Sequence, residues 1–230
     1  MSLMSNRCVL QLRRAARAMG VPRLLGRFAK GYESAFSKQL MSACRPGDIV
    51  WDVGANVGHY AISFSGWVGP SGRVFAFEPS HVNLSRLRSA CRGLPNVELR
   101  EYGLSDKAER ARFLEGSDHS TSRVLAPGEV APQDNEVELR TGDAVIQSGE
   151  AGLPNVMKID VEGHEFSVLK GLRTALMNRD LRSVFVEVHF GILDRSGRSD
   201  DPKHIESLLK RSGFELRWTD ASHIQAIRAI

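Results

Sequence analysis

The chain has 230 residues, of which 42% are hydrophobic and 25% are charged, and its formal net charge is +4. This composition is that of an ordinary soluble domain with a full-sized core, and it excludes intrinsically disordered and collagen-like proteins. No apolar run approaches the roughly 20 residues that cross a bilayer, and no signal-peptide core is present, so we expect a cytoplasmic protein. Cys8, Cys44 and Cys91 form no CxxC pair, which argues against a disulfide framework or a structural zinc site.

The positive charge is concentrated near the N-terminus. Residues 1–30 contain seven basic residues and no acidic one, which leaves a net charge of −3 on residues 31–230. A slightly acidic body does not favour a groove for a polyanion, so we expect no nucleic-acid partner. One helical face of the basic segment is apolar and is formed by Val9, Leu12, Ala16 and Met19. We therefore predict a basic helical extension over residues 1–45, which either packs on the main domain or contacts a membrane surface or an acidic partner.

Short apolar strands alternate with helical patterns from Asp48 onward. The first predicted strands are "DIVWDVG" (48–54), "RVFAFE" (73–78) and "VELRE" (97–101). The helical patterns between them cover 57–67 and 80–92. Such alternation is typical of βαβ units and therefore predicts an α/β fold with a parallel sheet.

The next stretches differ from this alternation. "RARFLE" (110–115) and "EVELRT" (136–141) are strand-like and flank a connection rich in Gly, Ser and Pro. They predict an inserted antiparallel β-hairpin or lid, and the connection over 116–135 is long enough to be a functional or disordered loop.

The alternation then resumes to the end of the chain. Strands are expected at 155–161, 183–190, 214–219 and 223–228, and helices at 163–177 and 202–212. We therefore expect the second half of the chain to complete the same sheet.

A glycine turn follows the first strand. "WDVGANVGHY" places Gly54 and Gly58 between strand and helix, where glycine lets the chain turn and lets a ligand approach the backbone. The spacing is not the GxGxxG of dinucleotide sites, and the adjacent Asp52 would repel a phosphate. Glu78 ends the second strand, where a carboxylate can accept hydrogen bonds from both ribose hydroxyls. The pattern predicts a site for a nucleoside without phosphates, such as S-adenosylmethionine.

The third strand is followed by "GLSD", residues 103–106. Ser105 and Asp106 either line the adenine pocket or serve as a turn or helix cap, and both interpretations stay open.

Acidic residues and an imidazole crowd the ends of two later strands. Asp160 and Glu162 follow an apolar strand in "KIDVEGHE", and Glu187 and His189 belong to "SVFVEVHF". Ligands of open parallel sheets bind beyond the carboxyl ends of the strands, so these four residues are predicted to be catalytic. Glu187 and His189 are expected to project from one face of a strand, because side chains alternate along it.

Two neighbours in the same motif receive other interpretations. Glu165 begins a helix, where the helix dipole favours an acid without any functional role. His164 is either solvent-facing or directed at the acceptor.

The segments "DVGANVGHY", "FAFEPS", "GLSD", "KIDVEGHE" and "VEVH" closely resemble the FkbM-type family of S-adenosylmethionine-dependent methyltransferases. The resemblance covers about Pro46 to Phe190 and implies a class I methyltransferase (Rossmann-like) fold over residues 46–230. That fold has a seven-stranded, mostly parallel sheet with helices on both faces and an antiparallel pair at one edge. By motif position, the resemblance assigns cofactor-binding roles to Asp52, Gly54, Asn56, Gly58, Glu78 and Asp106. It also implies methyl transfer, mostly to oxygen, often on sugars or secondary metabolites.

Methyl transfer to a hydroxyl also requires a group that accepts the hydroxyl proton. His189 suits this role by its ordinary pKa, and Asp160 either serves instead or orients the amino group of the cofactor. Hard oxygen ligands suit magnesium or calcium, but no metal-ligand spacing is met, so we expect no metal.

We therefore predict O-methylation of a hydroxyl on a sugar, glycan or small natural product, with S-adenosylmethionine as methyl donor. The alternatives are N-methylation of a small amine and a non-catalytic nucleoside-binding or scaffold protein with the same fold. The oligomeric state does not follow from the sequence.

Overall fold

The computed structural model describes residues 36–116, 122–126, 128–129 and 135–228. The chain divides into two compact units, Met1–Ser42 and Ala43–Ile230, and residues 36–43 are helical. The basic segment 1–30 lies outside the described residues, so the helical extension stays a prediction. Among the helices that are described, none is long and apolar enough to cross a membrane.

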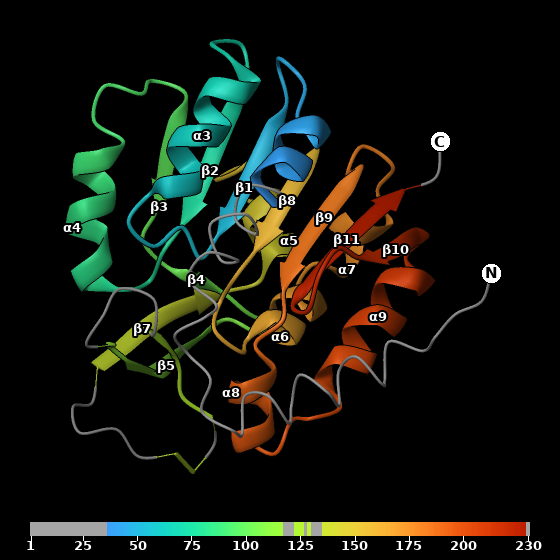
Figure 1. Ribbon diagram of the computed structural model, residues 1–230. Coiled ribbons are helices and arrows are strands. Elements are labelled where there is room, and N and C mark those ends of the chain that lie inside the picture. The colour runs from blue at the N-terminus through green and yellow to red at the C-terminus, as the bar shows by residue number, and fades with distance from the viewer. Residues whose placement is uncertain (1–35, 117–121, 127, 130–134, 229–230) are drawn as a thin grey trace, which may run out of the picture. The chain divides into compact units, whose positions relative to one another are not determined.

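The second unit is built on a seven-stranded sheet (Figure 1). In spatial order its strands are β3 (Val97–Arg100), β2 (Arg73–Phe77), β1 (Ile49–Val53), β8 (Val156–Ile159), β9 (Ser183–Glu187), β11 (His223–Arg228) and β10 (Phe214–Trp218). β11 is antiparallel to both of its neighbours, β9 and β10, and the other pairings in this sheet are parallel. The predicted class I methyltransferase sheet, with its antiparallel pair at one edge, is confirmed.

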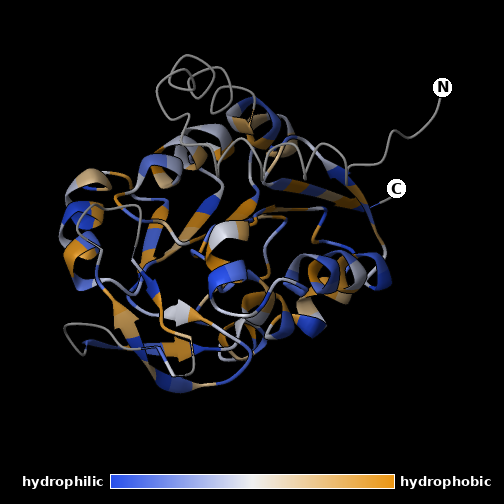
Figure 2. Ribbon diagram, turned by 60° about the horizontal axis from the view of Figure 1, so that its bottom comes forward, coloured by the Kyte–Doolittle hydropathy of each residue, from blue (hydrophilic) through white to orange (hydrophobic). Residues whose placement is uncertain are grey.

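Helices cover both faces of this sheet (Figure 1). The helices of this unit are α3 (His59–Val68), α4 (His81–Ala90), α5 (Gly142–Gln147), α6 (Glu165–Lys170), α7 (Arg173–Met177), α8 (Phe190–Arg195) and α9 (Asp201–Arg211), and α8 lies beyond the ends of the strands. Trp51 and Val53 of β1 belong to the core cluster that includes Leu169 of α6. Side chains alternate along β1, so Asp52 points to the opposite face, where it lies close to His59 of α3. Hydrophobic residues run along these strands in Figure 2, as expected for a sheet buried on both faces.

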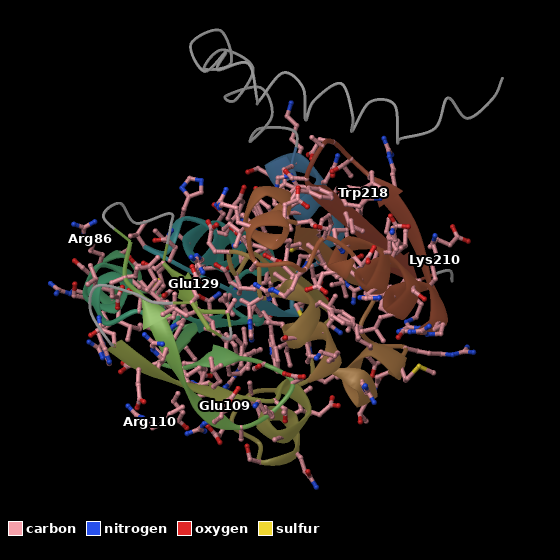
Figure 3. The ribbon with its side chains drawn as sticks, turned by 90° about the horizontal axis from the view of Figure 1, so that it is seen from below. Arg86, Glu109, Arg110, Glu129, Lys210 and Trp218 are labelled. Atoms are coloured by element: carbon pink, nitrogen blue, oxygen red, sulfur yellow. The ribbon has the colours of Figure 1, made fainter. Side chains whose placement is uncertain are left out.

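A smaller sheet is inserted between β3 and β8. Its strands, in spatial order, are β4 (Gly103–Leu104), β7 (Asn135–Arg140), β5 (Glu109–Leu114) and β6 (Arg123–Val124). The predicted antiparallel pair is confirmed as β5 and β7, and β4 and β6 extend it to four strands. Phe113, Val137 and Leu139 form the core of this insert, while Arg110 projects away from it (Figure 3).

The structure differs from the sequence prediction at the helix expected over 163–177. This segment forms two short helices, α6 and α7, separated at Gly171 and Leu172. The Ser105 carbonyl packs on Gly171 so closely that a Cβ there would lie 1.9 Å from its oxygen. The helix is therefore interrupted where the loop after β4 crosses it.

The strand expected over 183–190 is also shorter than predicted. β9 ends at Glu187, and the chain turns at His189, which is the residue immediately before α8. The prediction that Glu187 and His189 lie on one face of a single strand is therefore wrong. Neither α8 nor α5 was predicted from the sequence.

The close contact at Gly171 leads to a prediction about the free energy of unfolding. Gly171→Ala is expected to lower the free energy of unfolding by about 3 kcal/mol, because the new methyl group would displace backbone. Chemical denaturation monitored by circular dichroism measures the change.

Gly66→Ala is the matched control. Gly66 lies inside α3, and a Cβ on it would meet no neighbouring side chain or loop within 4 Å, so alanine should stabilise the helix by up to about 1 kcal/mol. Equal effects of the two substitutions would contradict the assigned cause of the helix break.

Candidate active site

The parallel strands β3, β2, β1, β8 and β9 end at the same edge of the main sheet. The chain runs from β1 to β2 on one side, whereas β8 pairs with β1 on the other, so the strand order reverses between β1 and β8. Such a reversal leaves a crevice beyond the carboxyl ends of the strands, where ligands of α/β proteins bind. A cavity of about 260 Å³ lies there.

The cavity brings together most of the predicted site residues. Those that line it are Gly54, Asn56, Glu78, Asp160, Glu162, Glu187 and His189. The inserted sheet contributes Phe113, Arg123, Val124 and Leu139 to the same lining. Residues from well-separated strands and their loops therefore meet at one place.

The glycine turn after β1 is held by backbone contacts. The N–H groups of Gly54 and Ala55 both donate to the carbonyl of Phe77, each at 3.0 Å. Gly54 has a φ of 81°, and a Cβ on it would lie 1.8 Å from the carbonyl oxygen of Asp160. Only glycine fits at this position, because the backbones of the two loops touch.

Glu78 fixes the far side of the same turn. Its side chain is buried, and its two carboxylate oxygens accept hydrogen bonds from the N–H groups of Asn56 at 2.7 Å and Ser80 at 2.9 Å. Burial raises the pKa of Glu78 to about 7, although both backbone hydrogen bonds oppose the shift. The side chain of Asn83 also donates a hydrogen bond to this carboxylate. A carboxylate has about four acceptor sites, so Glu78 keeps one with which to accept a ligand hydroxyl.

Two asparagine side chains in the lining have unused hydrogen-bonding capacity. The Oδ1 atoms of Asn56 and Asn83 are buried and have no hydrogen-bond partner among the described residues. Asn56 also has a φ of 52°, an uncommon conformation for a residue other than glycine. Buried polar atoms of this kind are costly unless a ligand or water satisfies them, so the pocket fits a polar ligand such as a nucleoside.

Lys158 lies beneath the loops that follow β1 and β8. Its buried Nζ is 3.2 Å from Oδ1 of Asp52, 3.2 Å from the carbonyl of Gly54 and 3.3 Å from Oδ2 of Asp160. Burial alone would lower the pKa of Lys158, but the two carboxylates outweigh it and raise the pKa. The ammonium group is therefore charged and connects the two loops. Asp52 itself sits behind the cavity wall.

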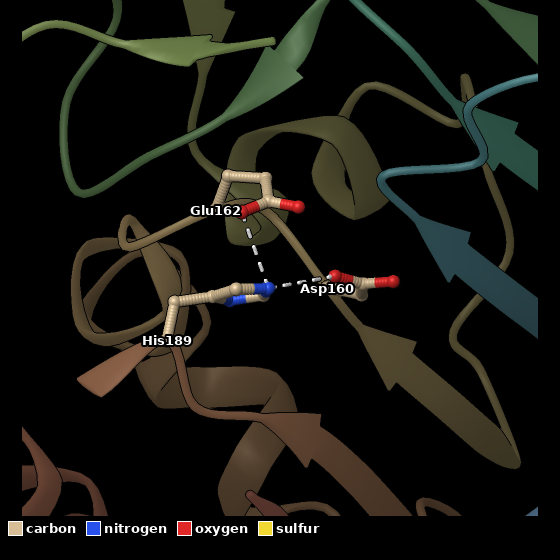
Figure 4. Close-up of side chains that lie close together, drawn as sticks. All are labelled: Asp160, Glu162 and His189. Atoms are coloured by element: carbon tan, nitrogen blue, oxygen red, sulfur yellow. Dashed lines mark ion pairs between the residues drawn. The ribbon is translucent and has the colours of Figure 1, made fainter. Parts of the chain in front are cut away.

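Asp160, Glu162 and His189 converge on one point of the cavity (Figure 4). Nε2 of His189 is 3.3 Å from Oε2 of Glu162 and 3.6 Å from Oδ1 of Asp160. Glu162 reaches this point from a loop residue with a φ of 51°. The acids predicted after β8 and the imidazole predicted after β9 thus form a single cluster.

A third acid, Glu165, contacts the other nitrogen of the imidazole. Oε1 of Glu165 is 2.8 Å from Nδ1 of His189 and accepts the N–H of Gly163 at 2.7 Å. The side chain of Glu165 is fully buried. Its assignment to a purely helix-dipole role missed this contact, because His189 is 24 residues further along the chain.

The carboxylates determine the protonation of His189. Burial alone would lower its pKa, but hydrogen bonds to Glu162 and Glu165, with the charge of Asp160, raise it to about 11. At neutral pH the ring is therefore an imidazolium. The ordinary pKa used to select His189 as a base does not apply in this environment.

Glu187 has a separate partner. Its Oε2 is 3.3 Å from Nε2 of the buried His223 on β11, and Nδ1 of His223 is 3.0 Å from Asp220. Burial opposes the charged form of His223, but these two acids raise its pKa to about 9. Glu187 therefore faces the cavity with a cation behind it.

Three other residues of the predicted site lie outside the cavity lining. Gly58, with a φ of 94°, is the residue immediately before α3, and a Cβ on it would lie 2.9 Å from the side chain of Leu87. Asp106 pairs with Lys170. Ser105 is buried, and its hydroxyl is 2.9 Å from Nε2 of His164, so His164 is not simply solvent-facing. Burial lowers the pKa of His164 to about 4, which keeps the ring neutral.

The cluster is also compact enough to hold a cation. One ligand atom each from Asp160, Glu162 and His189 lies within 4.8 Å of the other two. The ammonium of Lys158 and the imidazolium already supply positive charge to these acids. The absence of a catalytic metal stays a prediction.

Comparisons with known proteins identify the family of the chain. A family model described as "Methyltransferase FkbM domain" matches residues 52–216. A hexuronic acid methyltransferase, AglP, from Haloferax volcanii is 34% identical over 184 residues, which cover 78% of this chain and 69% of AglP. The 31-O-demethyl-FK506 methyltransferase FkbM of Streptomyces tacrolimicus is 30% identical over 176 residues, which cover 63% of this chain and 66% of the relative.

The fold resembles a solved structure as well. The methyltransferase FkbM from Methylobacillus flagellatus superposes with a TM-score of 0.54 at 18% identity. The match covers 80% of this chain and 44% of that chain. The chain therefore belongs to the FkbM family of S-adenosylmethionine-dependent methyltransferases.

Proposed function

We propose that this protein transfers a methyl group from S-adenosylmethionine to a hydroxyl oxygen of a sugar or of a small natural product. The observation that carries the proposal is that Gly54, Asn56 and Glu78 line the same cavity as Asp160, Glu162 and His189. The first three residues suit a nucleoside without phosphates, and the other three suit a neutral group that must lose a proton.

The cofactor is assigned to the end of the cavity next to β1 and β2. Glu78 accepts a ribose hydroxyl, while the unsatisfied Oδ1 of Asn56 accepts a further donor of the ligand. Gly54 lines the same part of the cavity, and Asp160 suits the cationic portion of the ligand. When bound, S-adenosylmethionine supplies a methyl group on a sulfonium sulfur. The bond between that sulfur and the methyl carbon breaks as the acceptor oxygen bonds to the carbon, and the sulfur leaves as a neutral thioether.

Glu162 is assigned as the group that accepts the proton of the acceptor hydroxyl. Because His189 is an imidazolium at neutral pH, a neighbouring carboxylate is the available proton acceptor. Glu162 faces the cavity, and burial raises its pKa, which makes it a better base than an exposed glutamate. His189 holds that carboxylate through Nε2, 3.3 Å away. The bond between oxygen and methyl carbon then forms as the proton passes to Glu162.

The acceptor class rests on the relatives and on the character of the site. AglP is described as a hexuronic acid methyltransferase, and this chain covers 69% of it. A hydroxylated sugar also matches the polar side chains at the acceptor end, where Glu162, Glu187 and Arg123 offer hydrogen bonds.

The raised pKa of Glu78 predicts how cofactor binding depends on pH. The ionised carboxylate accepts a ligand hydroxyl, so affinity for S-adenosylhomocysteine should fall as the pH drops below about 7 and level off above it. The fall should approach ten-fold per pH unit well below that value. Isothermal titration calorimetry between about pH 5.5 and 8.5 measures the dependence.

Glu78→Gln is the control for this pH profile. At about pH 8 it should weaken binding by about ten- to hundred-fold, because hydrogen bonds to a charged acceptor are lost, and the step near pH 7 should disappear. If the variant shows the same fall in affinity near pH 7 as the wild-type protein, Glu78 does not belong to the cofactor site.

Glu162→Gln tests the proton acceptor. The turnover number should fall by roughly 10²- to 10⁴-fold, since the amide accepts no proton, while affinity for S-adenosylhomocysteine changes little. Turnover is followed as transfer of a labelled methyl group to a panel of hydroxylated sugars, uronic acids and small amines.

Glu136→Gln provides the matched comparison. Glu136 is an exposed acid on β7 that pairs with Arg110 and does not line the cavity, so its replacement should leave turnover unchanged.

The same substrate panel tests the proposed acceptor class. If the wild-type protein methylates amines but no hydroxylated compound, the proposed acceptor class is overturned.

A further inference from the structure

We infer that Glu165 is a positioning residue: its carboxylate holds Nδ1 of His189 and thereby keeps Nε2 directed at the cavity. The inference rests on the proposed function, because it concerns the imidazole that holds Glu162. Glu165 does not line the cavity, so it acts through His189 and not on a substrate.

The first support is the geometry of the imidazole. Its two nitrogens face different acids, with Nδ1 2.8 Å from Glu165 and Nε2 3.3 Å from Glu162. A ring held at Nδ1 by a carboxylate has its orientation and its hydrogen-bonding pattern fixed, as in sites where a carboxylate orients a histidine. Rotation of the ring by half a turn would break the shorter of these two contacts.

The second support is burial. Glu165 is 0% exposed, and a buried carboxylate is costly unless hydrogen bonds and an opposite charge compensate it. The Gly163 N–H supplies one hydrogen bond at 2.7 Å, and the imidazolium supplies the charge. The Oε2 atom has no partner among the described residues, so His189 is the principal compensation for this charge.

The loop around Gly163 ties the same carboxylate to Glu162. Gly163 has a φ of 90°, and a Cβ on it would lie 2.8 Å from the side chain of Ile192 in α8. Its N–H donates to Glu165, so the backbone that carries Glu162 is fixed by the carboxylate that fixes His189. Glu165 therefore sets both members of the Glu162–His189 pair.

A helix-dipole role alone does not account for these contacts. An acid that serves only the dipole gains little from burial, and α6 has only six residues, over which the dipole is small. Asp201 in the first turn of the longer α9 offers a comparison, since it is an acid at a helix start away from the cavity.

The test combines spectroscopy with kinetics. In protein labelled with ¹⁵N-histidine and bound to S-adenosylhomocysteine, the Nδ1 proton of His189 should give a slowly exchanging resonance far downfield. Glu165→Gln should abolish this resonance, whereas Glu162→Gln should retain it. His189→Asn, which removes the ring, assigns the signal.

The kinetic arm uses the same variants. Glu165→Gln should lower the turnover number by roughly 10- to 100-fold with KM changed less than about two-fold, because the substrate contacts remain while their alignment is lost. Asp201→Asn should leave both the resonance and turnover unchanged. A Glu165→Gln protein that keeps the resonance and full turnover, and loses only thermal stability, would overturn the inference.

Two provisions keep the outcome decisive. If Glu165→Gln does not fold, Glu165→Asp keeps the charge but withdraws the acceptor by one methylene, and the same loss of resonance and turnover is expected.

The resonance is measured without a methyl acceptor, so it does not depend on which compound the protein methylates. A wild-type protein that methylates no hydroxylated compound would therefore refute the proposed acceptor class, while the resonance still decides whether Glu165 holds His189.

Discussion

The candidate site depends on one buried ammonium group. Lys158 is a residue of β8, and its Nζ contacts Asp52, the carbonyl of Gly54 and Asp160. Loss of one partner from such a buried charge cluster typically costs about 3–5 kcal/mol, because the remaining charge is left uncompensated. The cation therefore makes the alignment of the glycine turn with the acidic loop a condition of folding, and not a result of ligand binding.

The second constraint is the chain of contacts behind the acids. Glu165 contacts His189, His189 contacts Glu162, and across β9 and β11 Asp220 contacts His223, which contacts Glu187. In each chain a histidine stands between one carboxylate away from the cavity lining and another that lines it. This alternation of charge lets several acids face one small volume without mutual repulsion dominating.

The sequence was informative where local spacing determines position. The sheet, the glycine turn, Glu78 and Asp160 were predicted because the ends of parallel strands meet at one edge, whatever the loops do. Lys158 was missed because a lysine inside the apolar run of a strand has no local signal, and its partners in the glycine turn lie more than 100 residues away in the sequence. The contact between Glu165 and His189 was missed for the same reason, since it depends on the turn into α8.

The errors in the predicted elements also have long-range causes. The helix over 163–177 has an uninterrupted apolar pattern, and its break at Gly171 is set by the carbonyl of Ser105, which another loop supplies. The inserted sheet was predicted as a hairpin because β4 and β6 have only two residues each, too few for any periodicity.

The contact between Gly54 and the carbonyl of Asp160 has a consequence for protein engineering. Main chain meets main chain there, so no choice of side chain can widen or narrow the gap between the two loops. A redesign that seeks room for a larger cofactor analogue must change the length of a loop or the walls supplied by the inserted sheet. The side of the cavity lined by Phe113, Arg123 and Leu139 is therefore the adjustable one.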